Sequence, residues 1–325
     1  MRKKRVLAVG FFGEGNLGDQ AILRGIVSAV GNSASIIATS GNFYSGTEVE
    51  VVKRRGFLSW PLYLRELIRA DRVIFSGGIL QDWSFEGVLF YALRMIAARN
   101  FGRKPSLWGA GLGPLQRNLS NALAGKALKA VDVSWLRDLE SRETFFSLSG
   151  KRGNHGVDWS WGIPYSPESC RKTRFSTGIN IRPWFDRRWI IQAGNKAALK
   201  YESSAFIGIS ARREDTRIMA ATFPELKIHE PADFTALLEL CSGLKEGWAM
   251  RYHVLLAMLR CSVPVIPFPY DKKVLSLCKE AGVDTDIGAT SFDCPVKARR
   301  DFVSDAMVRY ELMKTAFIRY MDGSG

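Results

Sequence analysis

Two arginines and a histidine stand where a predicted strand ends or a predicted helix begins, and there they could bind an anion. Arg182 ends the apolar run of GINIRPW, and Arg251 and His253 lie in the first turn of the helix predicted from MRYHVLLAMLR. The dipole at a helix N-terminus disfavours cations and favours anions, so this arginine and histidine suggest an anionic ligand. The alternatives are an arginine paired with a surface carboxylate or lying along the surface, and a histidine bonded to a backbone carbonyl.

A second pair of arginines, Arg212 and Arg213, follows another predicted strand in FIGISARRED. A phosphate could bind there, and a solvated pair of surface charges is the alternative. His155 and His229 stand in loop-like surroundings and are interpreted as structural.

Three glycine-containing loops also follow predicted strands: Gly13 to Asp19, Phe75 to Phe85, and Trp108 to Gln116. Glycine allows a positive φ and a close approach of the backbone to a ligand. Open parallel sheets bind ligands at the carboxyl ends of their strands, which is where these loops are expected. For any single loop, a tight strand-to-helix turn is the alternative interpretation.

The first loop has the G-x-G-x-x-G spacing of a dinucleotide site, but its surroundings argue against one. Such a site expects a carboxylate about 20 residues on, at the end of the second strand, to bind the ribose. After Asp19, the next carboxylate is Glu48. Asp19 itself directly follows the third glycine, where it would repel a pyrophosphate. We therefore expect Asp19 to cap the helix or to bind a hydroxyl group.

Strands that alternate with helical patterns predict parallel sheets in two doubly wound, Rossmann-like α/β domains. The domains are predicted at residues 1–170 and 171–325, with a final helix over Lys297–Met321 packing across both. The expected strands are Val6–Phe12, Ser35–Ala38, Arg72–Phe75, Ser106–Gly109, Val131–Leu136, Gly178–Arg182, Ala205–Ser210, Leu226–His229 and Val263–Pro267.

Composition limits the partners. The 325 residues carry a formal net charge of +14, which favours anionic ligands such as phosphates or anionic lipids. The five cysteines are widely spaced and no histidine lies at zinc-ligand spacing, so we predict a reduced, cytoplasmic protein without a metal site. The basic residues are scattered and form no recognised nucleic-acid module, which argues against nucleic-acid binding. The apolar run after Arg5 is too short for a signal peptide and is interpreted as a strand.

Taken together, several strings resemble the polysaccharide pyruvyl transferase family and occur in the family's order. They are GNLGDQAIL, SGGILQD, GAGLGPL, LRDLESRE, GINIRPW, MRYH and VPVIPFPYDKKV. The chain departs from the family pattern at Ser76, where a third glycine is usual, at Tyr252, where leucine is usual, and at Lys272, where proline is usual.

The resemblance implies a GT-B-like fold, with two domains facing a cleft. It implies an enzyme that uses phosphoenolpyruvate, and no other cofactor, to place a pyruvyl ketal on a sugar of a cell-wall or exopolysaccharide precursor. The family's functional residues carry over to Arg182, Arg251 and His253. The C-terminal domain is the expected phosphoenolpyruvate side and the N-terminal domain the acceptor side. Substrate contacts are expected from Gly15, Asn16, Asp19, Gly77, Gly78, Asp82, Arg212 and Tyr252.

In this scheme Arg182 and Arg251 each hold one anionic group of phosphoenolpyruvate through two hydrogen bonds. His253 acts as an acid or stabilises the departing phosphate, and Asp19 or Asp82 accepts a proton from the sugar hydroxyl. A lipid-linked acceptor would bring the basic protein to the anionic inner face of the cell membrane. A nucleotide-sugar-dependent glycosyltransferase of the same architecture is the alternative function, and Asp271 is its candidate ribose ligand.

Overall fold

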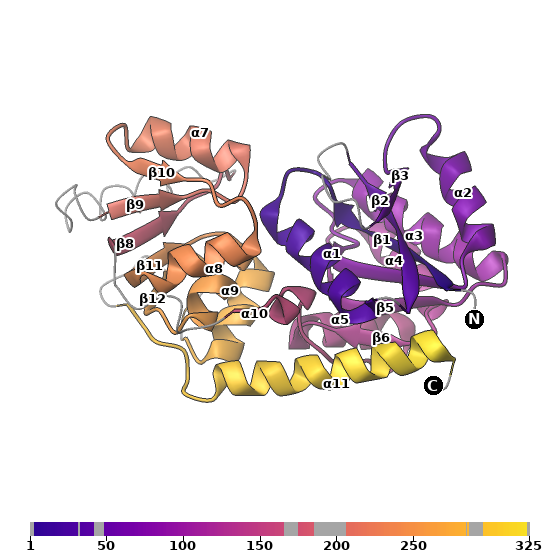
Figure 1. The fold of residues 1–325 in the computed structure, drawn as a ribbon. Helices are drawn as coiled ribbons and strands as arrows, with labels where there is room; N and C mark the ends of the chain where they lie inside the picture. The colour runs from indigo at the N-terminus through magenta and orange to yellow at the C-terminus, as the bar shows by residue number, and fades with distance from the viewer. Residues whose placement is uncertain are drawn as a thin grey trace. The chain divides into compact units, whose positions relative to one another are not determined.

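The computed structural model describes residues 3–31, 33–41, 49–165, 175–184, 206–283, 285 and 295–323. Contacts within the chain divide it into two compact units. Unit 1 comprises Met1–Glu14, Asp19–Gly162 and Ala306–Gly325, and unit 2 comprises Gly15–Gly18 and Ile163–Asp305. Each unit is built on a parallel sheet with helices packed against it (Figure 1). Residues 306–325 group with unit 1, whereas the sequence analysis places them in a C-terminal domain.

Unit 1 has a seven-stranded sheet in the order β3-β2-β1-β4-β5-β6-β7. Its strands are β1 (Lys4–Phe12), β2 (Ala34–Ser40), β3 (Glu50–Lys53), β4 (Arg72–Ile79), β5 (Pro105–Leu112), β6 (Ser134–Leu136) and β7 (Asn154–His155). Its helices are α1 (Leu17–Val30), α2 (Ser59–Arg69), α3 (Phe85–Asn100), α4 (Asn118–Lys129), α5 (Leu139–Ser149), the 3-10 turn η1 (Trp159–Gly162) and most of α11 (Phe302–Asp322). Residues 6–9 of β1 are fully buried, as expected for a central parallel strand covered on both faces.

Helix α11 is held on unit 1 by aromatic packing. The ring of Phe317 lies 4.9 Å from that of Trp108 and 5.1 Å from that of Trp159, measured between centroids. Arg72 Nε donates a hydrogen bond to the backbone carbonyl of Tyr320 at 3.0 Å. Glycine at position 162 leaves room for Tyr310, because a Cβ there would lie 2.1 Å from the tyrosine Oη. The last helix thus completes the core of unit 1 with residues far away in the sequence.

Unit 2 has a five-stranded sheet in the order β10-β9-β8-β11-β12. Its strands are β8 (Phe175–Asn180), β9 (Phe206–Ile209), β10 (Lys227–His229), β11 (Leu244–Ala249) and β12 (Val265–Pro267). Its helices are α7 (Arg213–Thr222), α8 (Phe234–Ser242), α9 (Tyr252–Arg260) and α10 (Lys272–Ala281).

The nine strands expected from sequence all correspond to observed strands, and three further strands were not expected. These are β3, the two-residue β7 and β11, which lies between β8 and β12. Gly247 lies inside β11. A Cβ at Gly247 would lie 2.4 Å from Sδ of Met258 on α9, so the glycine lets this helix pack closely on its strand.

Candidate functional site

The predicted site residues lie where the strand order of each sheet reverses. In unit 1, β1 lies between β2 and β4, and in unit 2, β8 lies between β9 and β11. Open α/β sheets bind ligands at such switch points, beyond the carboxyl ends of the strands. Arg182 follows β8, Arg251 follows β11, and Asp19 lies in the first turn of the helix after β1.

Asn180, the last residue of β8, organises the switch point of unit 2. Its fully buried side chain donates from Nδ2 to the Ile209 carbonyl at 2.8 Å and accepts at Oδ1 from the Arg251 N–H at 2.8 Å. Its backbone carbonyl accepts from the Met250 N–H at 3.1 Å. Asn180 therefore joins the ends of β9 and β11 to β8 and fixes the start of α9. The sequence analysis did not single it out, although an amide that ends an apolar strand was the available signal.

Arg182 lies two residues beyond the end of β8 and is half-buried. Its Nη1 donates to the hydroxyl of Tyr270 at 2.7 Å, and its guanidinium carbon lies 5.1 Å from the Tyr270 ring centroid and 5.2 Å from that of Trp184. These aromatic groups orient the cation without neutralising it. Within the described ranges, no carboxylate forms an ion pair with Arg182.

Arg251 has a different set of partners from the one expected. Its Nε and Nη2 donate to the two carboxylate oxygens of Asp215 at 2.6 and 2.5 Å, and both side chains are buried. Burial, the largest influence, lowers the pKa of Arg251, but the charge and hydrogen bonds of Asp215 outweigh it, and the pKa lies above its ordinary value. The two donors that we expected to hold a substrate anion are thus engaged by Asp215 in the structure, and the pairing fixes the N-cap of α9 against α7. Substrate contact by Arg251 stays a prediction.

His253 is the second residue of α9 and is buried to about nine tenths. Its ring contacts that of Tyr252 edge to face, with 5.0 Å between centroids, and that of Phe234 at 6.3 Å. Unit 2 also includes Gly18, where a Cβ would lie only 1.9 Å from Nδ1 of the imidazole. The glycine of the GNLGD string is thus required for the histidine to occupy its position.

The remaining predicted residues of unit 2 are less buried. Arg212, the N-cap of α7, pairs with Glu214 at 3.1 Å and is partly exposed, so it agrees with the solvated alternative and is still able to turn towards a ligand. Gly15 has a positive φ of 71°. The Asn16 side-chain oxygen accepts the N–H of Gly18 at 3.3 Å, which shapes the loop ahead of α1.

In unit 1 the structure brings Asp19 and Gly77 together. Gly77 has a φ of 79°, and a Cβ there would lie 3.8 Å from Oδ1 of Asp19. The neighbouring Gly78 accommodates the side chain of Gln81, because a Cβ at Gly78 would lie 2.6 Å from its Nε2. Asp19 is buried to more than nine tenths and lies in the first turn of α1, where the helix dipole favours a carboxylate.

Asp82, which we expect to contact a substrate, is engaged by internal hydrogen bonds in the structure. Its side chain is fully buried. It accepts hydrogen bonds from the N–H groups of Gln116 at 3.1 Å and Arg117 at 2.9 Å, and it forms an ion pair with the Arg117 side chain. Burial, the largest influence, raises the pKa of Asp82, but the hydrogen bonds outweigh it and hold the pKa below its ordinary value. The carboxylate connects the loop after β4 to the start of α4 and offers no oxygen to solvent.

We predict that Asp82→Asn lowers the free energy of unfolding at pH 7 by about 1–3 kcal/mol, because an amide cannot accept all of these hydrogen bonds. Because the pKa of Asp82 is lower in the folded protein than in the unfolded chain, the ionised carboxylate stabilises the fold at pH values above the unfolded pKa. This stabilisation is lost as the pH falls through the folded pKa. The difference from the wild type should therefore shrink below about pH 4. Urea denaturation between pH 8 and pH 3 measures it. A difference that does not change with pH would contradict the assigned role.

Arg137, at the end of β6 in the string LRDLESRE, is a further candidate that the sequence analysis did not single out. It is buried and pairs with Asp138 at 3.1 Å and Asp158 at 3.5 Å. A Cβ at Gly111 would lie 2.4 Å from its Nη2, so GAGLGPL leaves space for the guanidinium. An arginine directly after a strand was the signal that could have identified it.

Among the residues that the structure describes, no group of three or more His, Cys, Asp or Glu side chains could hold a metal ion. The helices within the same ranges are all too short or too polar to cross a bilayer.

Comparison with solved structures identifies the fold. UDP-N-acetylglucosamine 2-epimerase from Rickettsia bellii aligns with a TM-score of 0.60 at 11% identity, covering 99% of this chain and 98% of that one. UDP-GlcNAc 2-epimerase from Neisseria meningitidis, bound to UDP-GlcNAc, gives 0.59 at 10% identity, covering 95% and 93%. A UDP-glucosyltransferase from Polygonum tinctorium gives 0.53 at 11% identity, covering 99% and 93%. The protein has the GT-B fold, and the predicted fold class of two doubly wound Rossmann-like domains is confirmed.

The sequence identifies the family. The model of the polysaccharide pyruvyl transferase family matches residues 16–272, most of the chain, and we conclude that the protein belongs to this family. The resemblance of the seven strings is thereby confirmed, and the protein is a transferase of polysaccharide biosynthesis. No curated protein sequence matches the chain.

Proposed function

We propose that the protein transfers the pyruvyl group of phosphoenolpyruvate to two hydroxyl groups of a saccharide, forming a cyclic ketal and releasing phosphate. Its family supports this reaction. The structural observation that carries the proposal is Arg182, a cation oriented by Tyr270 and Trp184 and not neutralised by any carboxylate that the structure describes.

Phosphoenolpyruvate needs cationic partners because it carries both a phosphate and a carboxylate. Arg182 supplies a planar donor group that matches either anion. The helices α7, α9 and α10 begin beyond the carboxyl ends of β9, β11 and β12, and their positive N-termini add favourable potential at the same edge of the sheet. Arg251, neutralised by Asp215, instead keeps the first turn of α9 and His253 in position.

The reaction requires proton transfers that the named residues can perform. C3 of phosphoenolpyruvate gains a proton as a sugar hydroxyl adds to C2 and loses its own proton. The bond from C2 to the phosphate oxygen then breaks, and a second hydroxyl adds to C2, gives its proton to the departing phosphate and closes the ketal ring. C2 becomes oxocarbenium-like in these steps, so fixed charges and a positioned acid dominate the rate enhancement. We assign the acid, or the group that stabilises the departing phosphate, to His253, and the hydroxyl acceptor to Asp19.

The acceptor that we propose is a sugar of a cell-wall or exopolysaccharide precursor in the cytoplasm. Gly77, close to Asp19, allows a saccharide to approach the backbone of unit 1. The scheme requires no metal ion or cofactor besides phosphoenolpyruvate.

A nucleotide-sugar-dependent glycosyltransferase is the second candidate, because solved structures with this fold include a UDP-glucosyltransferase. Its proposed ribose ligand, Asp271, is buried, caps α10 by accepting the Lys273 N–H at 3.2 Å, and pairs with the Lys273 side chain at 3.1 Å. These bonds favour pyruvyl transfer over this alternative.

Melting temperatures measured with phosphoenolpyruvate and with a panel of nucleotide sugars separate the two functions, because a ligand stabilises the folded state it binds. We expect phosphoenolpyruvate to raise the melting temperature of the wild type and to raise that of Arg182→Ala much less. A rise with nucleotide sugars and none with phosphoenolpyruvate would favour the glycosyltransferase.

A further inference from the structure

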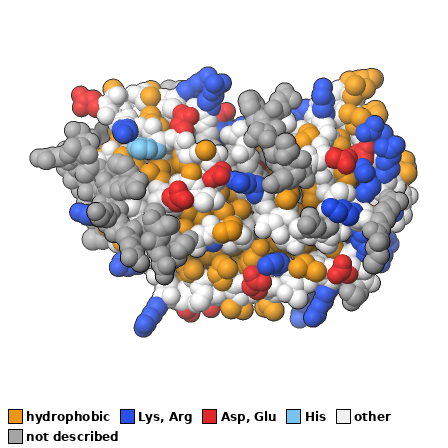
Figure 2. Space-filling view, in the orientation of Figure 1, with side chains coloured by type: hydrophobic (Ala, Val, Ile, Leu, Met, Phe, Trp, Pro, Cys, Tyr) orange, Lys and Arg blue, Asp and Glu red, His pale blue; other side chains and the backbone are white. Residues whose placement is uncertain are grey.

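Helix α2 and the loop before it expose apolar and basic side chains together. Phe57, Leu58 and Ile68 are 94%, 59% and 56% exposed. The side chains of Arg65 and Arg69 are 58% and 57% exposed. We call these five residues the α2 surface. Leu58, Arg65 and Arg69 follow a helical spacing that places them on one side of α2. In Figures 1 and 2, hydrophobic and basic side chains lie together on the side of unit 1 where α2 is found.

The opposite side of α2 belongs to the core. Tyr63 and Leu67 are fully buried in it. Glu66 is the one carboxylate in the sequence of α2. It is buried, accepts hydrogen bonds from Arg5 at 2.9 Å and Arg65 at 2.8 Å, and forms an ion pair with Arg69 at 3.6 Å. Three arginines thus share this carboxylate, and the α2 surface exposes apolar groups together with a net positive charge.

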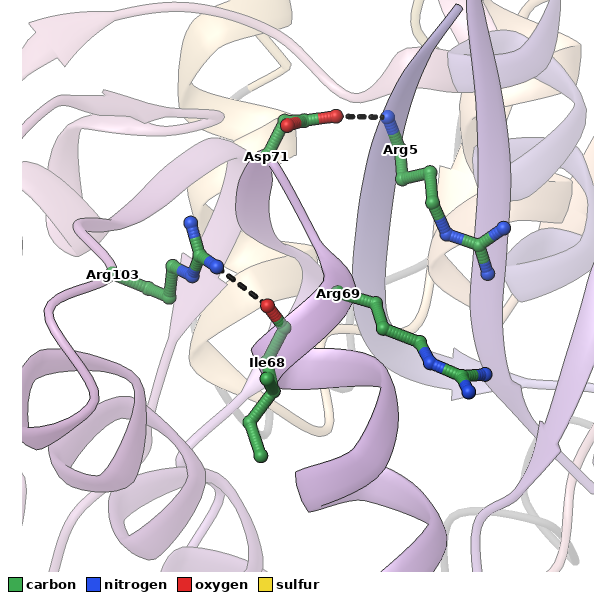
Figure 3. Close-up of a pocket in the computed structure, with 5 residues that line it drawn as sticks. All are labelled: Arg5, Ile68, Arg69, Asp71 and Arg103. Carbon is green, nitrogen blue, oxygen red and sulfur yellow. Dashed lines mark hydrogen bonds between the residues drawn. The ribbon is translucent and has the colours of Figure 1, made fainter.

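An arginine-lined pocket of about 530 Å³ opens at the C-terminal end of α2. It is lined by Arg5, Ile68, Arg69, Asp71 and Arg103, shown in Figure 3. The Asp71 carboxylate is engaged by the Arg5 N–H at 2.8 Å, and Arg103 donates from Nη2 to the Ile68 carbonyl at 2.5 Å. Arg103 also buries its Nε without a hydrogen-bond partner. Three guanidinium groups thus line the pocket with one carboxylate, Asp71, which is already engaged. Arg5 and Arg69 also pair with the buried Glu66, and Arg5 pairs with Glu50.

This pocket lies apart from the candidate functional site of unit 1. Arg5 is near the beginning of β1, and Asp71 directly precedes β4. The pocket is therefore at the amino ends of the strands, whereas Asp19 and Gly77 lie at or beyond the carboxyl ends. A ligand of the pocket would not compete with the acceptor proposed above.

We propose that the α2 surface docks unit 1 onto a membrane that contains anionic phospholipids. Phe57 and Leu58 enter the headgroup region, and Arg69 and Arg103 bind lipid phosphates at the pocket. Exposed apolar side chains interleaved with arginines are typical of helices that lie in a membrane interface. A second copy of the chain would bring the same positive charge against this surface, which disfavours self-association. Docking does not depend on pyruvyl transfer, although it would bring the enzyme to a lipid-linked acceptor.

Vesicle sedimentation without any substrate tests the proposal. Wild-type protein is mixed with vesicles of phosphatidylcholine alone or of phosphatidylcholine with phosphatidylglycerol. We expect roughly tenfold or more tighter binding to the anionic vesicles, weakening as salt is raised. The double variant Phe57→Ser/Leu58→Ser, which changes only exposed residues, should lose most of this binding. Arg69→Gln/Arg103→Gln should weaken binding to anionic vesicles and leave binding to neutral ones unchanged.

The matched control is Val308→Ser/Leu312→Ser on α11, because these apolar side chains are exposed to 60% and 58%. It should bind as the wild type does. Equal binding to both kinds of vesicle, no binding at all, or an equal loss in the α11 control would overturn the proposal. So would a dimer in sedimentation equilibrium that Phe57→Ser/Leu58→Ser dissociates while vesicle binding is unchanged. Because the vesicle experiment contains no phosphoenolpyruvate, a result that overturns membrane docking leaves the proposed catalytic function unchanged.

Discussion

Replacing His253 by alanine is expected to lower kcat for phosphate release from phosphoenolpyruvate and acceptor by about 10²- to 10⁴-fold. The imidazole sits in the first turn of α9 in a space that Gly18 leaves open. Binding of phosphoenolpyruvate should change little, because we assign the ground-state attraction to Arg182. Steady-state kinetics and calorimetric titration of the same variant separate the two effects.

His229→Ala is the control for this experiment. His229 is also in unit 2, but it belongs to β10 at the edge of the sheet, away from the switch point beside β8. The variant should release phosphate at close to the wild-type rate. Near-wild-type turnover in His253→Ala would remove His253 from the reaction.

Arg182→Ala should reduce kcat/KM by about 10²- to 10³-fold, because it removes a fixed cation from the anionic substrate and from the charge that develops on the departing phosphate. Arg182→Lys should recover only part of this loss, since lysine keeps the charge but not the planar pair of donors. Tyr270→Phe should have a smaller effect that falls mainly on KM, because it leaves the cation in place and removes the oxygen that orients it.

Arg217→Ala tests whether charge alone explains the result. Arg217 is an exposed arginine of α7 in the same unit, so its replacement changes the net charge by the same amount. Its kcat/KM should be nearly unchanged. An Arg182→Ala enzyme with unchanged KM and kcat would show that the substrate anion binds elsewhere.

The sequence predicts the strands and their ends because apolar runs and glycine loops are local signals. Strand β11 was not predicted because Lys245, Glu246 and Gly247 interrupt its apolar pattern. The reason for a glycine at position 247 is its close contact with Met258, which exists only when α9 packs on the strand. The sequence also located the C-terminal ends of three strands, β8, β1 and β4. It thereby placed Arg182, Asp19 and Gly77 at the switch points of the two sheets.

Long-range partners could not be predicted in the same way. Arg251 and Asp215 are 36 residues apart, and Asp82 is 34 residues from Gln116. Both pairings depend on which strands become neighbours, and a carboxylate on a loop looks the same in the sequence whether it faces solvent or two backbone N–H groups. For this reason the sequence placed two charged groups, Arg251 and Asp82, in substrate contact although the structure engages them internally.

The central claim, that phosphoenolpyruvate donates the transferred group, is tested most directly by mass spectrometry of saccharide acceptors after reaction with phosphoenolpyruvate labelled with ¹³C at all three carbons. The account predicts an acceptor that gains one pyruvyl ketal with all three labelled carbons, one phosphate released for each ketal formed, and about 10²- to 10³-fold slower formation of both products with Arg182→Ala. An acceptor that gains no label, but gains a sugar when a nucleotide sugar is supplied, would contradict it.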